Sequence, residues 1–74
     1  MEKELLKNAM RSIRRNLDLV DRLVAKKEFS ACQLIFVELR AKIGLLWEME
    51  LIECRHSEIL LNIVRKHEEE LWNV

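Results

Sequence analysis

The stretch Lys27-Glu28-Phe29-Ser30-Ala31-Cys32-Gln33-Leu34 carries the clearest boundary between two helices in this chain. Ser30 followed three residues later by Gln33 is the pattern of a capping box. In this motif the serine hydroxyl accepts a hydrogen bond from the Gln33 amide, and the glutamine side chain returns to Ser30. Phe29 and Leu34 have the spacing of the hydrophobic staple that often accompanies such a box. The stretch therefore predicts that one helix ends near residue 27 and that a second begins at residue 31.

The segment before this boundary has the apolar pattern of a helix that packs on another helix. Its apolar residues alternate between spacings of four and three: Leu6, Met10, Ile13, Leu17, Val20 and Val24. A heptad seam of this kind faces a partner helix, while the charged residues between its members face water. We therefore expect a helix over about residues 3–27.

The apolar residues after the boundary go nearly all the way round the expected second helix, and no proline marks its end. A helix from residue 31 to Trp72 would be about 63 Å long, whereas a compact chain of this size has a radius of gyration of roughly 11 Å. Two alternatives remain open. The helix breaks near Cys54–Ser57, with Ser57 capping a third helix, or it runs on to Trp72 in an elongated oligomer. We favour the break, because it gives two helices of similar length.

A helix that is apolar on all sides must be covered on several sides, so a single neighbouring helix is not enough. Two further seams run through the second half of the chain, one over Leu45, Met49, Ile52, His56, Ile59 and Ile63, and one over Leu60, Val64, His67, Leu71 and Val74. We expect Trp47 to lie in the core and Trp72 at an interface, since large aromatic side chains anchor interfaces. The residues that we expect at an interface between subunits are Leu45, Met49, Ile52, Ile59, Ile63 and Trp72.

Length and composition indicate one small all-α domain over residues 1–74. The chain weighs 8.9 kDa, is 50% hydrophobic and 35% charged, and contains one glycine and no proline. Sandwiches and barrels need turn residues that are missing here. A chain this short buries only about 60% of its unfolded surface and often needs a partner subunit. We therefore expect an antiparallel helical hairpin with a C-terminal helix or helix extension, assembled as a helical-bundle homo-oligomer.

The charges balance overall but not along the chain. Thirteen basic residues match thirteen acidic ones, so the strongly basic footprint of a nucleic-acid-binding protein is missing. Residues 1–40 carry nine bases and six acids, a charge of +3, and residues 41–74 carry four bases and seven acids, a charge of −3. Four arginines of the first helix form a candidate basic docking face: Arg11, Arg14, Arg15 and Arg22. The alternative is a solvated face paired within the helix through Arg14–Asp18 and Asp18–Arg22.

Neither a secretory signal nor a membrane span is expected. The N-terminal segment is charged throughout, and no apolar run approaches the roughly 20 residues that a span needs. Two cysteines without an export signal are typical of reduced thiols. We therefore expect a cytoplasmic protein.

The residues that could carry chemistry are few. Cys32, Cys54 and His56 are candidate metal ligands or sensing residues, and a position at the start of a helix would lower the pKa of the Cys32 thiol. Cys54 and His56 point in different directions on a continuous helix and could converge only at a break. The sequence has no glycine-rich phosphate loop, no HExxH motif and no nucleophile with a separate histidine and orienting acid. We therefore expect no enzymatic activity, no cofactor and no resident metal.

Part of the chain resembles the all-helical repressors that sense copper or formaldehyde. The resemblance runs over residues 10–56, through Arg11 to Arg15, Asp21 to Val24, Ala31-Cys32, Glu38 to Ala41, and His56. It implies that Cys32, Cys54 and His56 sense the ligand and that Arg11, Arg14 and Arg15 contact DNA. The chain departs from that family where Arg15-Asn16 replaces its Gly-Gln pair, which puts the repressor function in doubt.

The sequence thus leads to two functional hypotheses. The favoured one is a small helical protein–protein interaction module, a homodimer that binds and regulates another protein, because apolar surface is in excess and catalytic motifs are missing. The alternative is a metal- or thiol-responsive, all-helical DNA-binding repressor. The sequence does not indicate which protein is bound, or whether the oligomer is a dimer or a tetramer.

Overall fold

The computed structural model describes residues 2–72, and this part of the chain contains three helices and no strand. They are α1 (Glu2–Ala25), α2 (Phe29–Glu48) and α3 (Cys54–Trp72). The prediction of an all-helical fold is confirmed, and the chain takes the alternative with a third helix. Val74, the last member of one expected seam, lies outside the described residues.

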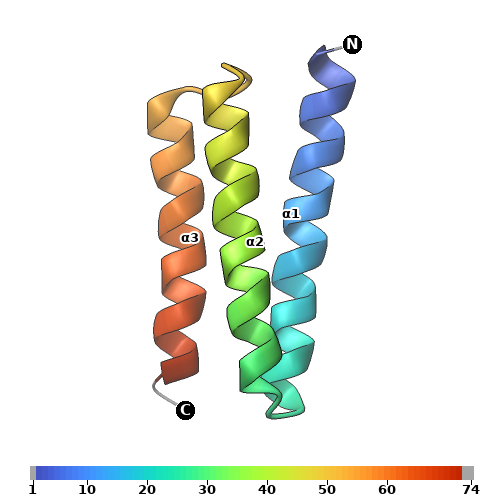
Figure 1. The fold of residues 1–74 in the computed structure, drawn as a ribbon, viewed down its shortest axis with the longest axis vertical. Coiled ribbons are helices and arrows are strands. Elements are labelled where there is room, and N and C mark those ends of the chain that lie inside the picture. The colour runs from blue at the N-terminus through green and yellow to red at the C-terminus, as the bar shows by residue number, and fades with distance from the viewer. Residues whose placement is uncertain (1, 73–74) are drawn as a thin grey trace.

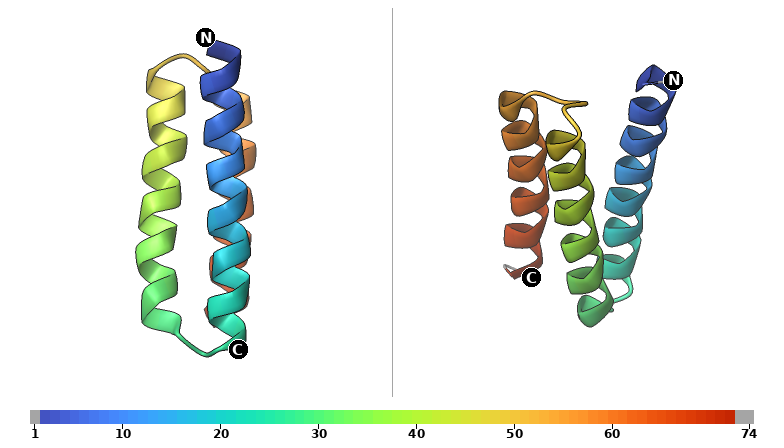
Figure 2. Two further views of the ribbon diagram at one scale, coloured as in Figure 1. Left: turned by 90° about the vertical axis from the view of Figure 1, so that its right-hand side faces the viewer. Right: turned by 45° about the horizontal axis from the view of Figure 1, so that its top comes forward.

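The three helices form an open bundle with α2 between the other two. Figure 1 shows that the chain reverses at each turn, so that α1 and α3 run in the same direction and α2 runs in the opposite one. The side view in Figure 2 places α2 on one side and both α1 and α3 on the other. Helix α2 packs along α1 and along α3, whereas α1 and α3 hardly touch. The helices therefore occupy three corners of a square rather than a closed triangle.

The core is built from one apolar seam on each helix. The seam of α1 is confirmed, with Ile13 and Val20 buried and the other members half-buried. Helix α2 contributes a seam at spacings of four and three, Cys32, Phe36, Leu39, Ile43 and Leu46. Helix α3 contributes Leu60, Val64 and Leu71. Of the remaining apolar residues of α2, Ile35 packs against the edge of this core, whereas Leu34, Val37, Leu45 and Trp47 are exposed.

The first turn differs from the expected capping box. Lys27 has a left-handed backbone with φ 60°, and the amides of Lys27 and Glu28 donate to the carbonyls of Val24 at 3.0 Å and Leu23 at 2.9 Å. This pattern is a Schellman motif, which ends α1 and reverses the chain within three residues. Helix α2 then begins at Phe29, two residues earlier than predicted, and its first turn receives no side-chain cap. Ser30 lies inside the helix, so the capping-box prediction is wrong.

The second turn comes earlier than the predicted break. Helix α2 ends at Glu48, and Glu50 has φ 59°, with the Leu51 amide donating to the Leu46 carbonyl at 3.0 Å. This is a second Schellman motif. Leu46 and Leu51 occupy the two positions at which an apolar contact commonly accompanies the motif. Ser57 lies in the first turn of α3, where its hydroxyl donates to the Cys54 carbonyl at 2.6 Å instead of capping the helix. The break exists, but residues 49–53 form it.

Polar contacts fix how the helices sit against each other. Lys42 of α2 donates to the Ser12 hydroxyl of α1 at 2.7 Å. Arg40 of α2 forms an ion pair with Glu68 of α3. At the far end of α1, Asp21 lies 3.7 Å from the His67 ring of α3.

Candidate protein-interaction surfaces

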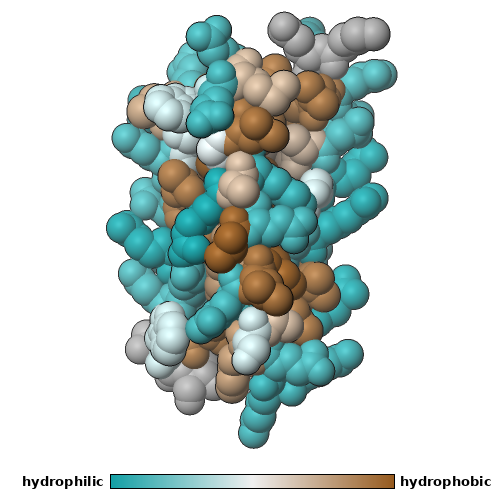
Figure 3. Space-filling view, in the orientation of Figure 1, coloured by the Kyte–Doolittle hydropathy of each residue, from teal (hydrophilic) through white to brown (hydrophobic). Residues whose placement is uncertain are grey.

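The outer face of α2, defined here as Leu34, Val37, Ala41 and Leu45, lies opposite the core and is apolar. The side chains of Leu34, Val37 and Leu45 are 75%, 63% and 56% exposed. In Figure 3, where α2 is nearest the viewer, several brown patches lie along the middle of the molecule, with teal side chains between them. Gly44 lies beside this face, and a methyl group added to it would meet nothing within 4 Å. Nothing in the described part of the chain covers the outer face.

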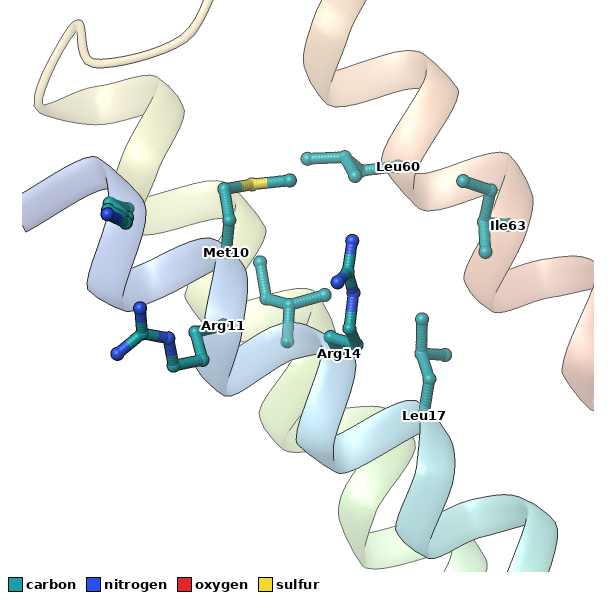
Figure 4. A pocket seen from close by; sticks show the side chains of 8 residues that line it. Met10, Arg11, Arg14, Leu17, Leu60 and Ile63 are labelled. Atoms are coloured by element: carbon teal, nitrogen blue, oxygen red, sulfur yellow. The ribbon is translucent and has the colours of Figure 1, made fainter. Parts of the chain in front are cut away.

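A second surface is the groove between α1 and α3, with a volume of about 440 Å³. Its walls are five apolar and three basic side chains, Lys7, Met10, Arg11, Ile13, Arg14, Leu17, Leu60 and Ile63. Figure 4 shows Met10, Arg14 and Leu17 reaching from α1 toward Leu60 and Ile63 on α3, while Arg11 points away from α3. Among the side chains of residues 3–72, no acidic one lines the groove.

A smaller hollow of about 200 Å³ lies between the start of α1 and the end of α2. It is almost wholly apolar and is lined by Leu5, Ala9, Ser12, Lys42, Leu45, Leu46, Met49 and Leu51. Leu45 belongs both to this hollow and to the outer face of α2. The hollow therefore extends the apolar surface of α2 toward the N-terminus of α1.

The six residues expected at an interface do not form one surface. Leu45 and Met49 line the small hollow, Ile63 lines the groove, Ile59 is exposed on α3, and Trp72 is exposed near the end of α3. Ile52 is 7% exposed and belongs to the core. The expected seam from Leu45 to Ile63 requires one continuous helix, and the turn at residues 49–53 interrupts it.

Sequence reasoning also misplaced Trp47, which is 51% exposed instead of buried. It missed Leu34 and Val37 as surface residues. The sequence did contain a signal for these exposed residues. Apolar residues lie on all sides of α2, and only one stripe of them can face the core, so the others must be exposed. The heptad at Cys32, Phe36, Leu39, Ile43 and Leu46 would have identified that stripe and left Leu34 and Val37 outside.

The four arginines of the candidate basic face are all exposed on α1, as expected for a docking or solvated face. Two of them, Arg11 and Arg14, line the groove, and Arg15 and Arg22 do not. The ion pairs expected through Asp18 are not formed: among residues 2–72, neither Arg14 nor Arg22 lies within ion-pair distance of an acid. Arg14 is therefore a cation in an apolar groove without a carboxylate partner in the described chain.

The candidate sensing residues are not brought together. Cys32 is fully buried in the core, and Cys54 is exposed at the start of α3, at the opposite end of α2 (Figure 1). Burial, with a smaller contribution from Glu28, raises the pKa of the Cys32 thiol, so the expected lowering by the helix start is wrong. His56 is exposed and close to Cys54 in sequence. Within residues 2–72, no three His, Cys, Asp or Glu side chains are grouped as a metal site.

Comparisons with known proteins add no relatives. The chain matches no protein-family model, no curated protein and no solved structure. Among the described residues, no helix is both long enough and apolar enough to span a membrane.

Proposed function

We propose that this protein is a small helical protein–protein interaction module that acts as a homodimer, in which the outer faces of two α2 helices pack against each other. The dimer presents its remaining surfaces to another protein and regulates it. The observation that carries the proposal is the apolar outer face of α2, which nothing in the described chain covers.

The chain exposes more surface than a folded monomer of its mass, which supports an interface with a partner subunit. Folded monomers of this mass expose about 4,800 Å², whereas this chain exposes 5849 Å². The excess of about 1,000 Å² is comparable with the roughly 800 Å² that each partner buries in a standard interface. One interface between two copies would therefore remove it.

The residues around the outer face of α2 favour a second copy of the same helix. Two charged residues that flank the middle of the face are already paired, Glu38 with Lys42 at 3.2 Å and Arg40 with Glu68. Packing around Ala41 would therefore leave neither of these two charges unpaired. Ala41 and Gly44 are small, so the backbones of two helices can approach closely there. A two-fold axis near Ala41 would place the larger apolar side chains of one copy against those of the other.

Cross-linking through a cysteine at position 41 tests this arrangement. We would replace Ala41 by Cys in a Cys54→Ser background and treat the protein with a short bis-maleimide. Cys32 is fully buried and will not react in the folded chain. The matched control is Asp18→Cys, exposed on α1. We expect efficient covalent dimers for Ala41→Cys and few for Asp18→Cys; equal yields, or none at position 41, would contradict the proposal.

A further inference from the structure

We propose that the groove between α1 and α3 binds an acidic amphipathic helix of a partner protein, which docks as the fourth helix of a bundle. This inference rests on the proposed role as an interaction module, but it does not depend on dimerisation through α2. The inference rests on the position and the lining of this groove. It lies where a four-helix bundle would have its fourth helix, and its apolar lining is bordered by the basic side chains of Lys7, Arg11 and Arg14.

The arrangement of the helices defines the shape of the ligand. In an antiparallel four-helix bundle, every helix packs against two neighbours around a shared core. Here α2 packs along both neighbours, whereas α1 and α3 each pack closely along α2 alone and meet each other only weakly, as between Asp21 and His67. Figure 2 shows α1 and α3 on the same side of α2, and Figure 4 shows the side chains that line the groove between them. A fourth helix in this position would give α1 and α3 their second neighbours.

The length of the groove fits a helix of about three turns. Its lining on α1 runs from Lys7 to Leu17, and ten helical residues span about 15 Å. Met10 and Leu17 lie one heptad apart on α1, and Leu60 and Ile63 face them from α3. Apolar side chains at spacings of three and four on a docking helix would pack between these residues, which is the usual mode of helix-in-groove recognition.

The charges of the groove define the chemistry of that helix. Its three basic side chains form no ion pair with any side chain of residues 3–72. The nearest acids on α1 do not line the groove, and one of them, Asp21, contacts His67 of α3. Arg14 projects toward Leu60 and Ile63 (Figure 4). A carboxylate on the docking helix would give its guanidinium a charge-assisted and bidentate partner.

A second copy of this chain fits the groove poorly. A two-fold axis through the groove would bring its three cations against the same three cations of the other copy, which costs free energy instead of releasing it. The outer face of α2 has no such conflict. The two surfaces therefore suit different partners, a second copy at α2 and an acidic helix at the groove.

Peptide binding tests the inference directly. The probe is a fluorescein-labelled helical peptide of four turns, with Leu on one face and Glu on the flanks, titrated with the full chain at low ionic strength and followed by anisotropy. A peptide of the same composition with scrambled order has the same charge and no apolar face. We expect the amphipathic peptide to bind and the scrambled peptide to bind at least about tenfold more weakly, because apolar packing in the groove is lost.

Two pairs of variants locate the site. Arg14→Glu should weaken binding by about tenfold or more, whereas Arg15→Glu, exposed on the same helix but outside the groove, should leave it nearly unchanged. Ile63→Ala should weaken binding more than Ile59→Ala, since only Ile63 lines the groove. A peptide with Lys in place of Glu should bind Arg14→Glu better than wild type.

Three outcomes would overturn the inference: no binding of the amphipathic peptide, equal effects of Arg14→Glu and Arg15→Glu, or binding only of duplex DNA or anionic vesicles offered in parallel. The titration is repeated with Val37→Glu, a variant of the outer face of α2. Undiminished peptide binding to a monomeric Val37→Glu separates the groove from the dimer, so failure of one proposal can be told from failure of the other.

Discussion

Replacing Gly44 by Ala separates the properties of the single chain from those of its assembly. Gly44 lies in the interior of α2 with an ordinary helical backbone, and an added methyl group would meet nothing within 4 Å. Alanine is more favourable than glycine in a helix interior by about 1 kcal/mol. The dilute, monomeric protein should therefore gain about 1 kcal/mol in its free energy of unfolding, which raises the Tm by roughly 4–8 °C for a domain of this size.

The same substitution should have the opposite effect on the dimer. A methyl group beside the outer face of α2 would keep two α2 helices apart, so Gly44→Ala should raise the dissociation constant while it stabilises the monomer. Urea unfolding followed by circular dichroism at low protein concentration measures the first effect, and sedimentation equilibrium measures the second. The reverse exchange, Ala41→Gly, should cost the dilute protein about 1 kcal/mol in the same urea assay.

Either of two results would refute this reasoning. A loss of stability in the dilute Gly44→Ala protein would mean that the space beside Gly44 is filled within the folded chain. A gain in stability without any weakening of self-association would mean that no partner helix approaches at Gly44.

Four further predictions follow from the core and the turns. Ile43→Val should lower the free energy of unfolding by about 0.5–1.5 kcal/mol because Ile43 is fully buried, whereas Ile59→Val, half exposed, should change it little in urea unfolding. Lys27→Gly should raise the unfolding free energy by about 0.5–1 kcal/mol, because glycine adopts φ 60° without strain; a loss would contradict the Schellman geometry. Asn16→Ala should stabilise the chain by about 1 kcal/mol in the same assay, because the Asn16 side-chain amide nitrogen is buried without a partner; destabilisation would indicate a partner. The raised pKa of Cys32 means that the folded state holds this proton more tightly than the unfolded state, so stability should fall as pH rises above about 9.0, the ordinary pKa of a cysteine thiol, and Cys32→Ala should remove that part of the pH dependence.

Much of the fold was predictable because heptad spacing depends only on local geometry. The seam from Leu6 to Val24 identified α1 and its buried side correctly. Both turns were misplaced for one physical reason: each helix ends on a left-handed residue that is not glycine, Lys27 and Glu50, so no glycine signal marks it. The second turn, Met49 to Glu53, also contains three apolar residues, Met49, Leu51 and Ile52, whose spacing in the sequence looks like that of a continuing helix.

The candidate surfaces were predictable only in part. The sequence indicated that α2 has too much apolar surface for one neighbour, and it singled out Arg11 and Arg14 on α1. It could not place the groove, because that depends on how far α1 and α3 lie from each other across α2. The interface residues from Leu45 to Ile63 were grouped on the assumption of a continuous helix, and the turn distributes them over separate surfaces.

Sedimentation equilibrium of the wild type beside Val37→Glu tests the central claim most directly. Burying the 63% of Val37 that is exposed is worth roughly 1–2 kcal/mol per subunit, hence roughly 2–4 kcal/mol per dimer, or about 30- to 1,000-fold in the dissociation constant. We predict that the wild type sediments at twice 8.9 kDa and that Val37→Glu sediments as a monomer, while Leu19→Glu, an exposed apolar site on α1, remains dimeric. A wild type that stays monomeric at high concentration, or a Val37→Glu protein that still forms dimers, would contradict the account.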